Sequence, residues 1–207
     1  MGNANPTVFV VDDDEPVRDA IAMLLDTVEL PYETFASAQE FLAAYDKEST
    51  GCLVLDIRMP GMSGLELQEH LRKMHAPIPI VFITGHGDIP MAVEAMKRGA
   101  VDFIRKPFRD QELLDRVQEA LSHDRDQRAA HQNLEEIRSR VATLTPREYE
   151  VFQRVADGQA NKVVAIELGI SERTVEIHRS QVMQKTRART LADLVRMKLT
   201  LDQSPAA

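Results

Sequence analysis

The chain of 207 residues holds a single cysteine, Cys52, and no tryptophan. Disulfides are therefore not part of the framework, and Cys52, which lies in an apolar run, is expected in the core of a protein from a reducing compartment. No apolar run approaches the ~20 residues of a membrane-spanning helix, and the first residues lack the basic and apolar regions of a signal peptide. We therefore expect a cytoplasmic protein that has no membrane partner.

Positive charge is scarce in the first two thirds of the chain. Residues 1–142 hold fifteen basic and twenty-five acidic residues, while residues 143–207 hold ten basic and eight acidic ones. The two parts therefore carry net charges of about −10 and +2. Within the second part, residues 172–190 carry five arginines and lysines against two glutamates. This concentration of positive charge indicates a candidate nucleic-acid contact.

Four apolar runs in the first part are typical of short buried strands, and polar side chains follow each of them. The runs cover residues 8–11, 53–55, 80–83 and 101–104. The side chains at their ends are Asp12, Asp13, Asp56, Thr84 and Lys106. Ligand chemistry in open α/β sheets lies at the carboxyl ends of parallel strands. If the four strands lie parallel in one sheet, the other side chains converge on Asp56, which becomes the candidate reactive group.

Helical patterns alternate with these strands. Apolar side chains at helical spacing follow Glu15, Ser37 and Ser63, and residues 32–35 add a further short strand. A fourth helical pattern ends at Gly99, and a fifth begins near Asp110. Strand and helix alternate five times along the chain, which predicts a doubly wound α/β domain with a five-stranded parallel sheet.

A stretch that is polar on every side, residues 122–128, indicates the end of this domain. Beyond it, apolar residues recur at alternating spacings of four and three, at Leu134, Ile137, Val141 and Leu144. That spacing suits a solvated helical linker or a brief coiled coil. We therefore predict an α/β domain over residues 1–123, a helical linker over 124–142 and an all-helical domain over 143–207.

The second domain opens with a strong helix-start pattern. Thr145 can cap a helix, Pro146 suits its first turn and Glu148 can complete a capping box. Two helices follow with a tight turn at Gly169 between them, and Ser171 can cap the second of these, which carries basic residues. A short helix, a glycine-containing turn and a capped basic helix form the helix-turn-helix pattern, and a fourth helix follows.

Both domains resemble known families. The carboxylate, hydroxyl and ammonium side chains at the four strand ends resemble the phosphorylation site of response-regulator receiver domains. Residues 144–148 and 174–179 resemble the four-helix LuxR-type DNA-binding domain. Almost the whole chain is similar to the transcriptional regulators of the FixJ and NarL type. The resemblance implies a CheY-like receiver with the strand order 2-1-3-4-5.

Crowded carboxylates indicate a metal site. Two carboxylates within ~5 Å repel by roughly 3 kcal/mol at an effective dielectric constant of about 20, and a divalent cation removes that repulsion. Oxygen ligands and retained waters suit Mg²⁺, with Mn²⁺ as an alternative. The resemblance implies that Asp13 and Asp56 bind the cation directly. It also implies that Arg58 contributes its backbone carbonyl and that Asp12 acts through water.

The resemblance further implies that a sensor histidine kinase phosphorylates Asp56. The Asp56 carboxylate would attack the phosphorus of a phosphohistidine and become an aspartyl phosphate. Lys106 and the cation would stabilise the charge on the transferred group, and Thr84 would donate a hydrogen bond to it. Thr84 and Phe103 are the expected switch residues, although Phe103 fits simple core packing equally well. A cis peptide bond is expected before Pro107.

The capped basic helix of the second domain is expected to enter the major groove of DNA. Its outward residues Glu176, Ile177 and Ser180 would read bases, because glutamate accepts from a cytosine amine and isoleucine contacts a thymine methyl. Lysines that relatives carry at such positions are missing, which argues against lysine-to-guanine readout. Thr174 belongs to the same motif, and His178 fits either core packing or a phosphate contact. The expected phosphate contacts, which position the protein without specifying sequence, are Asn161, Lys162, Arg173, Arg179, Lys185 and Arg187.

Together these patterns predict a two-component response regulator that is not a dedicated enzyme. Its own chemistry would be limited to gaining and losing a phosphoryl group at Asp56. Phosphorylation should promote a homodimer through the fourth helix, fifth strand and fifth helix, and the dimer should bind a DNA operator with paired half-sites. RNA polymerase is a further expected partner.

Two other classes remain open from the sequence. A ligand-sensing quorum regulator shares the DNA-binding domain, but residues 1–123 lack its sensing domain. A phosphoaspartate phosphatase would need a general acid and a substrate pocket, and neither is visible in the sequence.

Overall fold

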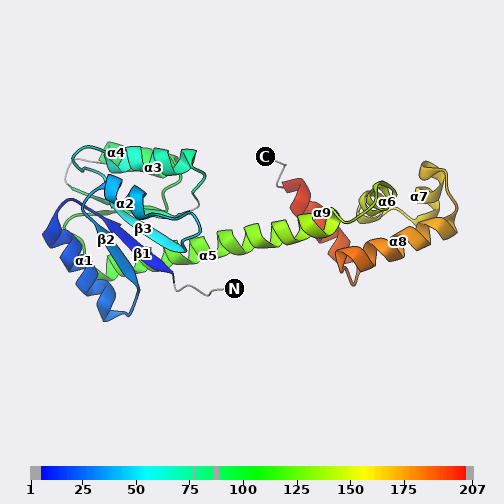
Figure 1. The fold of residues 1–207 in the computed structure, drawn as a ribbon, viewed down its shortest axis with the longest axis horizontal. Coiled ribbons are helices and arrows are strands. Elements are labelled where there is room, and N and C mark those ends of the chain that lie inside the picture. The colour runs from blue at the N-terminus through cyan, green and yellow to red at the C-terminus, as the bar shows by residue number, and fades with distance from the viewer. Residues whose placement is uncertain (1–5, 77, 86–88, 204–207) are drawn as a thin grey trace. The chain divides into compact units, whose positions relative to one another are not determined.

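The computed structural model describes residues 6–76, 78–85 and 89–203. Contacts between residues divide the chain into two compact units, Met1–Arg128 and Ala129–Ala207. Helix α5 (Asp110–Val141) contributes residues to both units (Figure 1). Within the described part of the chain, no helix combines the length and the apolar character that a membrane crossing requires.

A parallel five-stranded sheet forms the centre of the first unit. Its strands are β1 (Thr7–Val11), β2 (Tyr32–Phe35), β3 (Gly51–Asp56), β4 (Ile80–Thr84) and β5 (Asp102–Arg105). They lie in the order β2-β1-β3-β4-β5, which confirms the predicted strand order. Strand β3 is central, and all six of its residues are buried. Asp56 therefore ends a strand that is both central and fully buried.

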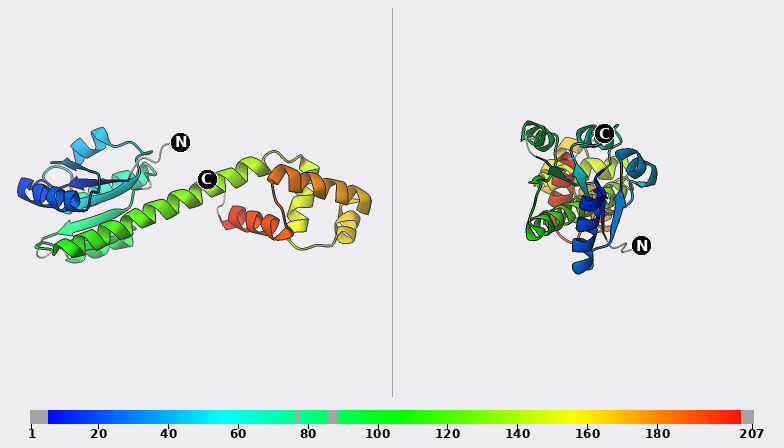
Figure 2. Two further views of the ribbon diagram at one scale, coloured as in Figure 1. Left: turned by 90° about the horizontal axis from the view of Figure 1, so that it is seen from below. Right: turned by 90° about the vertical axis from the view of Figure 1, so that its left-hand side faces the viewer.

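Helices cover both faces of this sheet, as a doubly wound fold requires (Figure 1 and Figure 2). One face carries α2 (Ala38–Ala44), α3 (Gly64–Lys73) and α4 (Ile89–Lys97), and the other carries α1 (Glu15–Thr27) and α5. Alternate side chains of a strand point to opposite faces. Leu53 accordingly packs with Phe41 in the first core, whereas Cys52 packs with Ile21 in the second. Cys52 is buried, as predicted.

A buried carboxylate of helix α5, that of Asp124, is hydrogen-bonded to the amino-terminal edge of the sheet. Asp124 is only 3% exposed, and it accepts hydrogen bonds from the Gly51 backbone N–H at 3.0 Å and from Arg128 Nε at 2.8 Å. Arg128 also donates to the backbone carbonyl of Ser49. We call these four residues the sheet-edge cluster. Part of the stretch expected to be polar on every side thus contacts the first unit, and the boundary after residue 123 stays a prediction.

We expect Asp124→Ala to lower the free energy of unfolding of the first unit by roughly 3–5 kcal/mol, because the Arg128 charge and the Gly51 amide lose their buried partner. Native-state hydrogen exchange at the β3 amides measures this change. Asp126→Ala removes an exposed carboxylate from the same helix and should alter exchange little. Equal exchange in the two variants would show that the sheet-edge cluster does not stabilise the unit.

The second unit is built from four short helices and the end of α5. The four helices are α6 (Pro146–Ala156), α7 (Asn161–Leu168), α8 (Glu172–Thr186) and α9 (Leu191–Gln203). Ile137 and Val141 of α5 are buried in the same core as Phe152. This differs from the solvated linker or brief coiled coil that their spacing suggested. The reason is that the core of the short helices supplies an apolar partner within the same unit.

Local capping fixes where the helices of the second unit begin and end. Thr145 and Glu148 form the predicted reciprocal capping box at the start of α6. The Ser171 hydroxyl accepts a hydrogen bond from the Thr174 backbone N–H at the start of α8. Gly169 ends α7 with a φ of 65°, a conformation that glycine adopts without strain. These local signals confirm the predicted helix-turn-helix arrangement.

Candidate functional site

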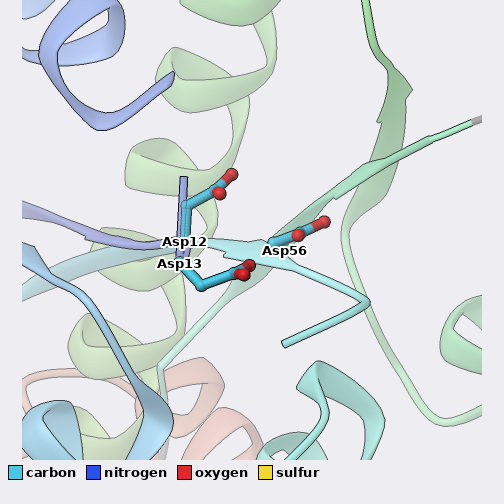
Figure 3. A group of neighbouring side chains, drawn as sticks. All are labelled: Asp12, Asp13 and Asp56. Atoms are coloured by element: carbon cyan, nitrogen blue, oxygen red, sulfur yellow. The ribbon is translucent and has the colours of Figure 1, made fainter. Parts of the chain in front are cut away.

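Three carboxylates gather where β1 and β3 end (Figure 3). Asp12 and Asp13 follow β1, and Asp56 is the last residue of β3. Each residue offers one carboxylate oxygen, and these oxygens all lie within 4.8 Å of one another. Asp12 and Asp56 are buried, whereas Asp13 is exposed. The structure therefore brings together the three acids that the strand pattern placed at one edge of the sheet.

Protein donors occupy both carboxylate oxygens of Asp12. Oδ1 accepts a hydrogen bond from the Asp14 backbone N–H at 3.0 Å, and Oδ2 accepts one from Lys106 Nζ at 2.7 Å. The backbone carbonyl of Asp12 accepts a further bond from Arg18 Nη1 at 2.7 Å. Arg18 was not a predicted site residue, and its place in the first helix after the acids was the only signal. These hydrogen bonds fix the position of the Asp12 carboxylate and of its backbone.

Lys106 and Thr84 reach the same edge from β5 and β4. Lys106 Nζ lies 3.5 Å from Asp56 Oδ2, farther than from Asp12. Thr84 is 2% exposed, and its hydroxyl donates to the backbone carbonyl of Gly85 at 3.2 Å. The peptide bond between Lys106 and Pro107 is cis, as expected. Phe103, in β5, packs against the first core, so its switch role stays a prediction.

Burial makes Asp56 a weaker acid than an ordinary aspartate. Its burial and the neighbouring Asp12 charge raise the pKa of Asp56 to about 6, although Lys106 and the Arg58 backbone N–H oppose the shift. Burial alone would lower the pKa of Lys106, but its contacts with Asp12 and Asp56 raise it overall. Among the residues that the structure describes, the three carboxylates of the site outnumber the one ammonium, that of Lys106, which pairs with them. A further cation at Asp56 would favour the ionised carboxylate.

The donor set suits a hard divalent cation. Mg²⁺ prefers oxygen ligands, takes few protein ligands and retains several waters, and the exposed Asp13 leaves room for such waters. Arg58 lies two residues beyond Asp56, and its backbone N–H donates to the Asp56 carboxylate. Residue 58 is thus beside the acids, as the predicted carbonyl ligand requires. Together these groups can hold Mg²⁺ or Mn²⁺.

The predicted DNA-reading residues lie on the exposed face of α8. Glu176, Ile177 and Ser180 are exposed, while Val175 and Val182 on the opposite face are buried. Ile177 is 53% exposed, so this face carries a large apolar side chain among its polar ones. The exposed face of α8 can therefore offer both polar and apolar contacts to a partner.

The residues predicted to contact phosphates differ in their exposure and in their side-chain partners. Lys162 and Arg173 are exposed near the starts of α7 and α8, and Thr174 and His178 are half-buried on α8. Arg179 Nη1 donates to Asn161 Oδ1 at 3.1 Å and joins α8 to the start of α7. Lys185 Nζ lies 2.6 Å from Glu148 Oε2. Sequence reasoning did not find this last pair, whose members lie on different helices.

Comparison with known proteins gives matches to both units. Residues 8–118 match the response regulator receiver domain, and residues 142–198 match the luxR family of bacterial regulatory proteins. Nodulation protein W of Bradyrhizobium diazoefficiens is 53% identical over 94% of this chain and 86% of its own length. The transcriptional regulatory protein FixJ of Rhizobium meliloti is 47% identical over 93% of this chain and 95% of its own length.

Two solved structures cover nearly the whole chain. The response regulator StyR is 48% identical, with a TM-score of 0.84 over 96% of this chain and 100% of that chain. Full-length FixJ from B. japonicum is 40% identical, with a TM-score of 0.61 over 97% of this chain and 98% of that chain.

Proposed function

This chain belongs to the two-component response regulators that join a receiver domain to a LuxR-type DNA-binding domain, and we propose that a sensor histidine kinase phosphorylates it on Asp56. The observation that carries the proposal is the position of Asp56 at the end of the central strand, beside two carboxylates and the Lys106 ammonium. Family membership makes the chain a transcription regulator and not a quorum sensor, because its first unit is a receiver. It also argues against a dedicated phosphatase.

In the proposed reaction an Asp56 carboxylate oxygen forms a bond to the phosphorus of a phosphohistidine. The phosphorus–nitrogen bond breaks, and its electron pair returns to the imidazole. Lys106 Nζ, 3.5 Å from Asp56 Oδ2, would stabilise negative charge on the transferred oxygens. The Thr84 hydroxyl would exchange its present contact for a hydrogen bond to one of these oxygens. Loss of the phosphoryl group to water would return the chain to its resting state.

A bound Mg²⁺ or Mn²⁺ ion would neutralise the carboxylates and the incoming phosphoryl group. We propose that Asp13 and Asp56 bind it directly, that the Arg58 backbone carbonyl is a third ligand and that Asp12 acts through water. Asp12 accepts hydrogen bonds from the Asp14 backbone N–H and from Lys106 Nζ, and its remaining lone pairs can accept one from a water that binds the ion.

We expect Asp13→Ala to weaken Mg²⁺ binding by about tenfold or more, because the cation keeps one direct carboxylate ligand and loses a full charge at contact distance. Phosphorylation should slow accordingly, while the fold should survive because repulsion among the acids falls. Isothermal titration calorimetry measures the affinity. Asp19→Ala, which removes an exposed carboxylate from α1, is the matched control. An unchanged affinity in folded Asp13→Ala would count against this ligand set.

We further propose that phosphorylation pairs two chains through α4, β5 and α5, and that the paired α8 helices bind an operator in the cytoplasm. The two half-sites should lie about one helical turn apart, because paired recognition helices must enter the same face of DNA. The exposed face of α8 supports groove insertion, and Glu176 and Ile177 would read bases. Contact with RNA polymerase is the further partner that we propose for activation of transcription.

DNA selection tests this function directly. The chain is phosphorylated with acetyl phosphate and Mg²⁺ and used to select duplexes from a random pool. We expect the retained sequences to share two related half-sites, and we expect much weaker enrichment with the unphosphorylated chain. Absence of any shared sequence in both selections would contradict sequence-specific regulation by α8.

A further inference from the structure

Glu148 is a buried carboxylate that joins the start of α6 to the end of α8. It is 6% exposed although it lies in the first turn of a helix. Its Oε2 accepts a hydrogen bond from the Thr145 backbone N–H at 2.7 Å and one from Lys185 Nζ at 2.6 Å. Glu148 therefore serves a capping box and an interhelical ion pair with the same oxygen.

Arg147, the residue before Glu148, is hydrogen-bonded to α7, the first helix of the helix-turn-helix pair. Arg147 Nη2 donates to the backbone carbonyl of Leu168, the last residue of α7, at 3.1 Å. Residues 147 and 148 thus contact α7 and α8 respectively. The start of α6 holds both helices of the pair in position.

Lys185 has a different environment from the exposed basic residues of this unit. Its side chain is 31% exposed, and its ammonium lies against the buried Glu148 carboxylate. A lysine that contacts a DNA phosphate would need that ammonium at the surface. If Lys185 turned to a phosphate, Glu148 would remain buried without its charge partner, which is costly. In contrast, Lys162 is exposed at the start of α7.

We propose that Lys185 is a positioning residue, which fixes recognition helix α8 against α6 through Glu148 and makes no contact with DNA phosphate. The inference rests on the proposed DNA binding by α8, and it reassigns a residue that was expected to contact DNA. Lys185 acts on affinity only through the placement of Glu176, Ile177 and Ser180.

Salt dependence separates positioning from phosphate contact. Each phosphate contact adds about 0.9 to the slope of log affinity against log salt concentration, whereas a positioning residue adds nothing to it. The full chain is titrated with a short labelled duplex of fixed arbitrary sequence at several salt concentrations. Lys162→Met should reduce the magnitude of this slope by about one. Lys185→Met should leave the slope unchanged, because Lys185 contacts no phosphate, and an equal loss of slope in both variants would overturn the proposal.

Hydrogen exchange in the absence of DNA tests the same role independently of DNA binding. Lys185→Met should speed exchange of the α8 amides by about tenfold, because a hydrogen bond between charged groups is lost. Lys185→Arg should restore protection, and Lys162→Met should leave it unchanged. Adding Glu148→Gln to Lys185→Met should cause little further loss of α8 protection, because both substitutions remove the same Glu148–Lys185 ion pair.

The two measurements also distinguish this inference from the proposed function. Unchanged α8 exchange in Lys185→Met would overturn the positioning role even if the chain binds DNA. Faster exchange in a chain that shows no salt-dependent DNA binding would instead support the Glu148–Lys185 pair and contradict the proposed function of α8.

Discussion

Asp56→Asn should take up no phosphoryl group from acetyl phosphate and Mg²⁺, whereas the parent chain should gain one acid-labile group. The amide of asparagine offers no carboxylate oxygen as a nucleophile. The neighbouring acids are poorer candidates, because Asp12 is buried with its carboxylate hydrogen-bonded to the Asp14 backbone N–H and Lys106, and Asp13 is exposed and follows an outer strand of the site rather than the central one. Intact mass spectrometry at neutral pH measures the added group. Undiminished phosphorylation of Asp56→Asn would refute the assignment of the acceptor.

A loss of phosphorylation in this variant should not reflect misfolding. Burial and the Asp12 charge raise the pKa of Asp56 to about 6 from an ordinary value of 3.8. Because the folded state raises this pKa, the protonated Asp56 carboxyl adds to the free energy of unfolding. That contribution is fully present below pH 3.8 and is lost as the pH rises through about 6. Asparagine carries no charge at any pH, so metal-free Asp56→Asn should be at least as stable as the parent at neutral pH. Asp19→Asn is the control, and it should be phosphorylated normally.

Phosphorylation should tighten binding to a two-half-site operator by roughly 10²–10⁴ and should change binding to a single half-site little. A DNA-binding domain with a net charge of about +2 and few free basic contacts should bind weakly alone. When two phosphorylated receivers pair, binding of the second DNA-binding domain becomes nearly intramolecular. The gain then comes from effective concentration and needs no new contact with DNA.

The test is a titration of both duplexes with phosphorylated and unphosphorylated protein, combined with sedimentation to determine the oligomeric state. Asp56→Asn treated with acetyl phosphate is the matched control, and it should bind as the unphosphorylated chain does. If phosphorylation tightens binding equally on both duplexes while the protein stays monomeric, pairing is not the mechanism. Relief of inhibition by the receiver would then be the better explanation.

Much of the receiver could be predicted because its signals are local. Each apolar run leads directly into its polar side chain, and parallel strands place their carboxyl ends at one edge, so the meeting of Asp12, Asp13 and Asp56 follows from the topology. The caps at Ser171 and in the box of Thr145 and Glu148 are likewise set by neighbouring residues, and the structure has them as expected.

The contacts that sequence reasoning missed join residues far apart in the chain. Asp124 looked solvated because its neighbours are polar, yet its partner is a backbone amide of β3. The buried partner of Lys185 lies in α6, and only a known helix packing reveals that pair. Ile137 and Val141 show a spacing that suits several kinds of partner. The spacing cannot tell which apolar surface covers them.

The sheet-edge cluster has a consequence for hybrid regulators in which one receiver is fused to a different output domain. A junction placed after residue 123 would exchange Asp124 and Arg128 for foreign residues and leave the Gly51 amide and the Ser49 carbonyl without their partners. A junction placed after Arg128 keeps all four residues in the donor receiver. Fusions at the later junction should therefore give better-folded chimeras, even though the earlier position falls where the sequence turns polar.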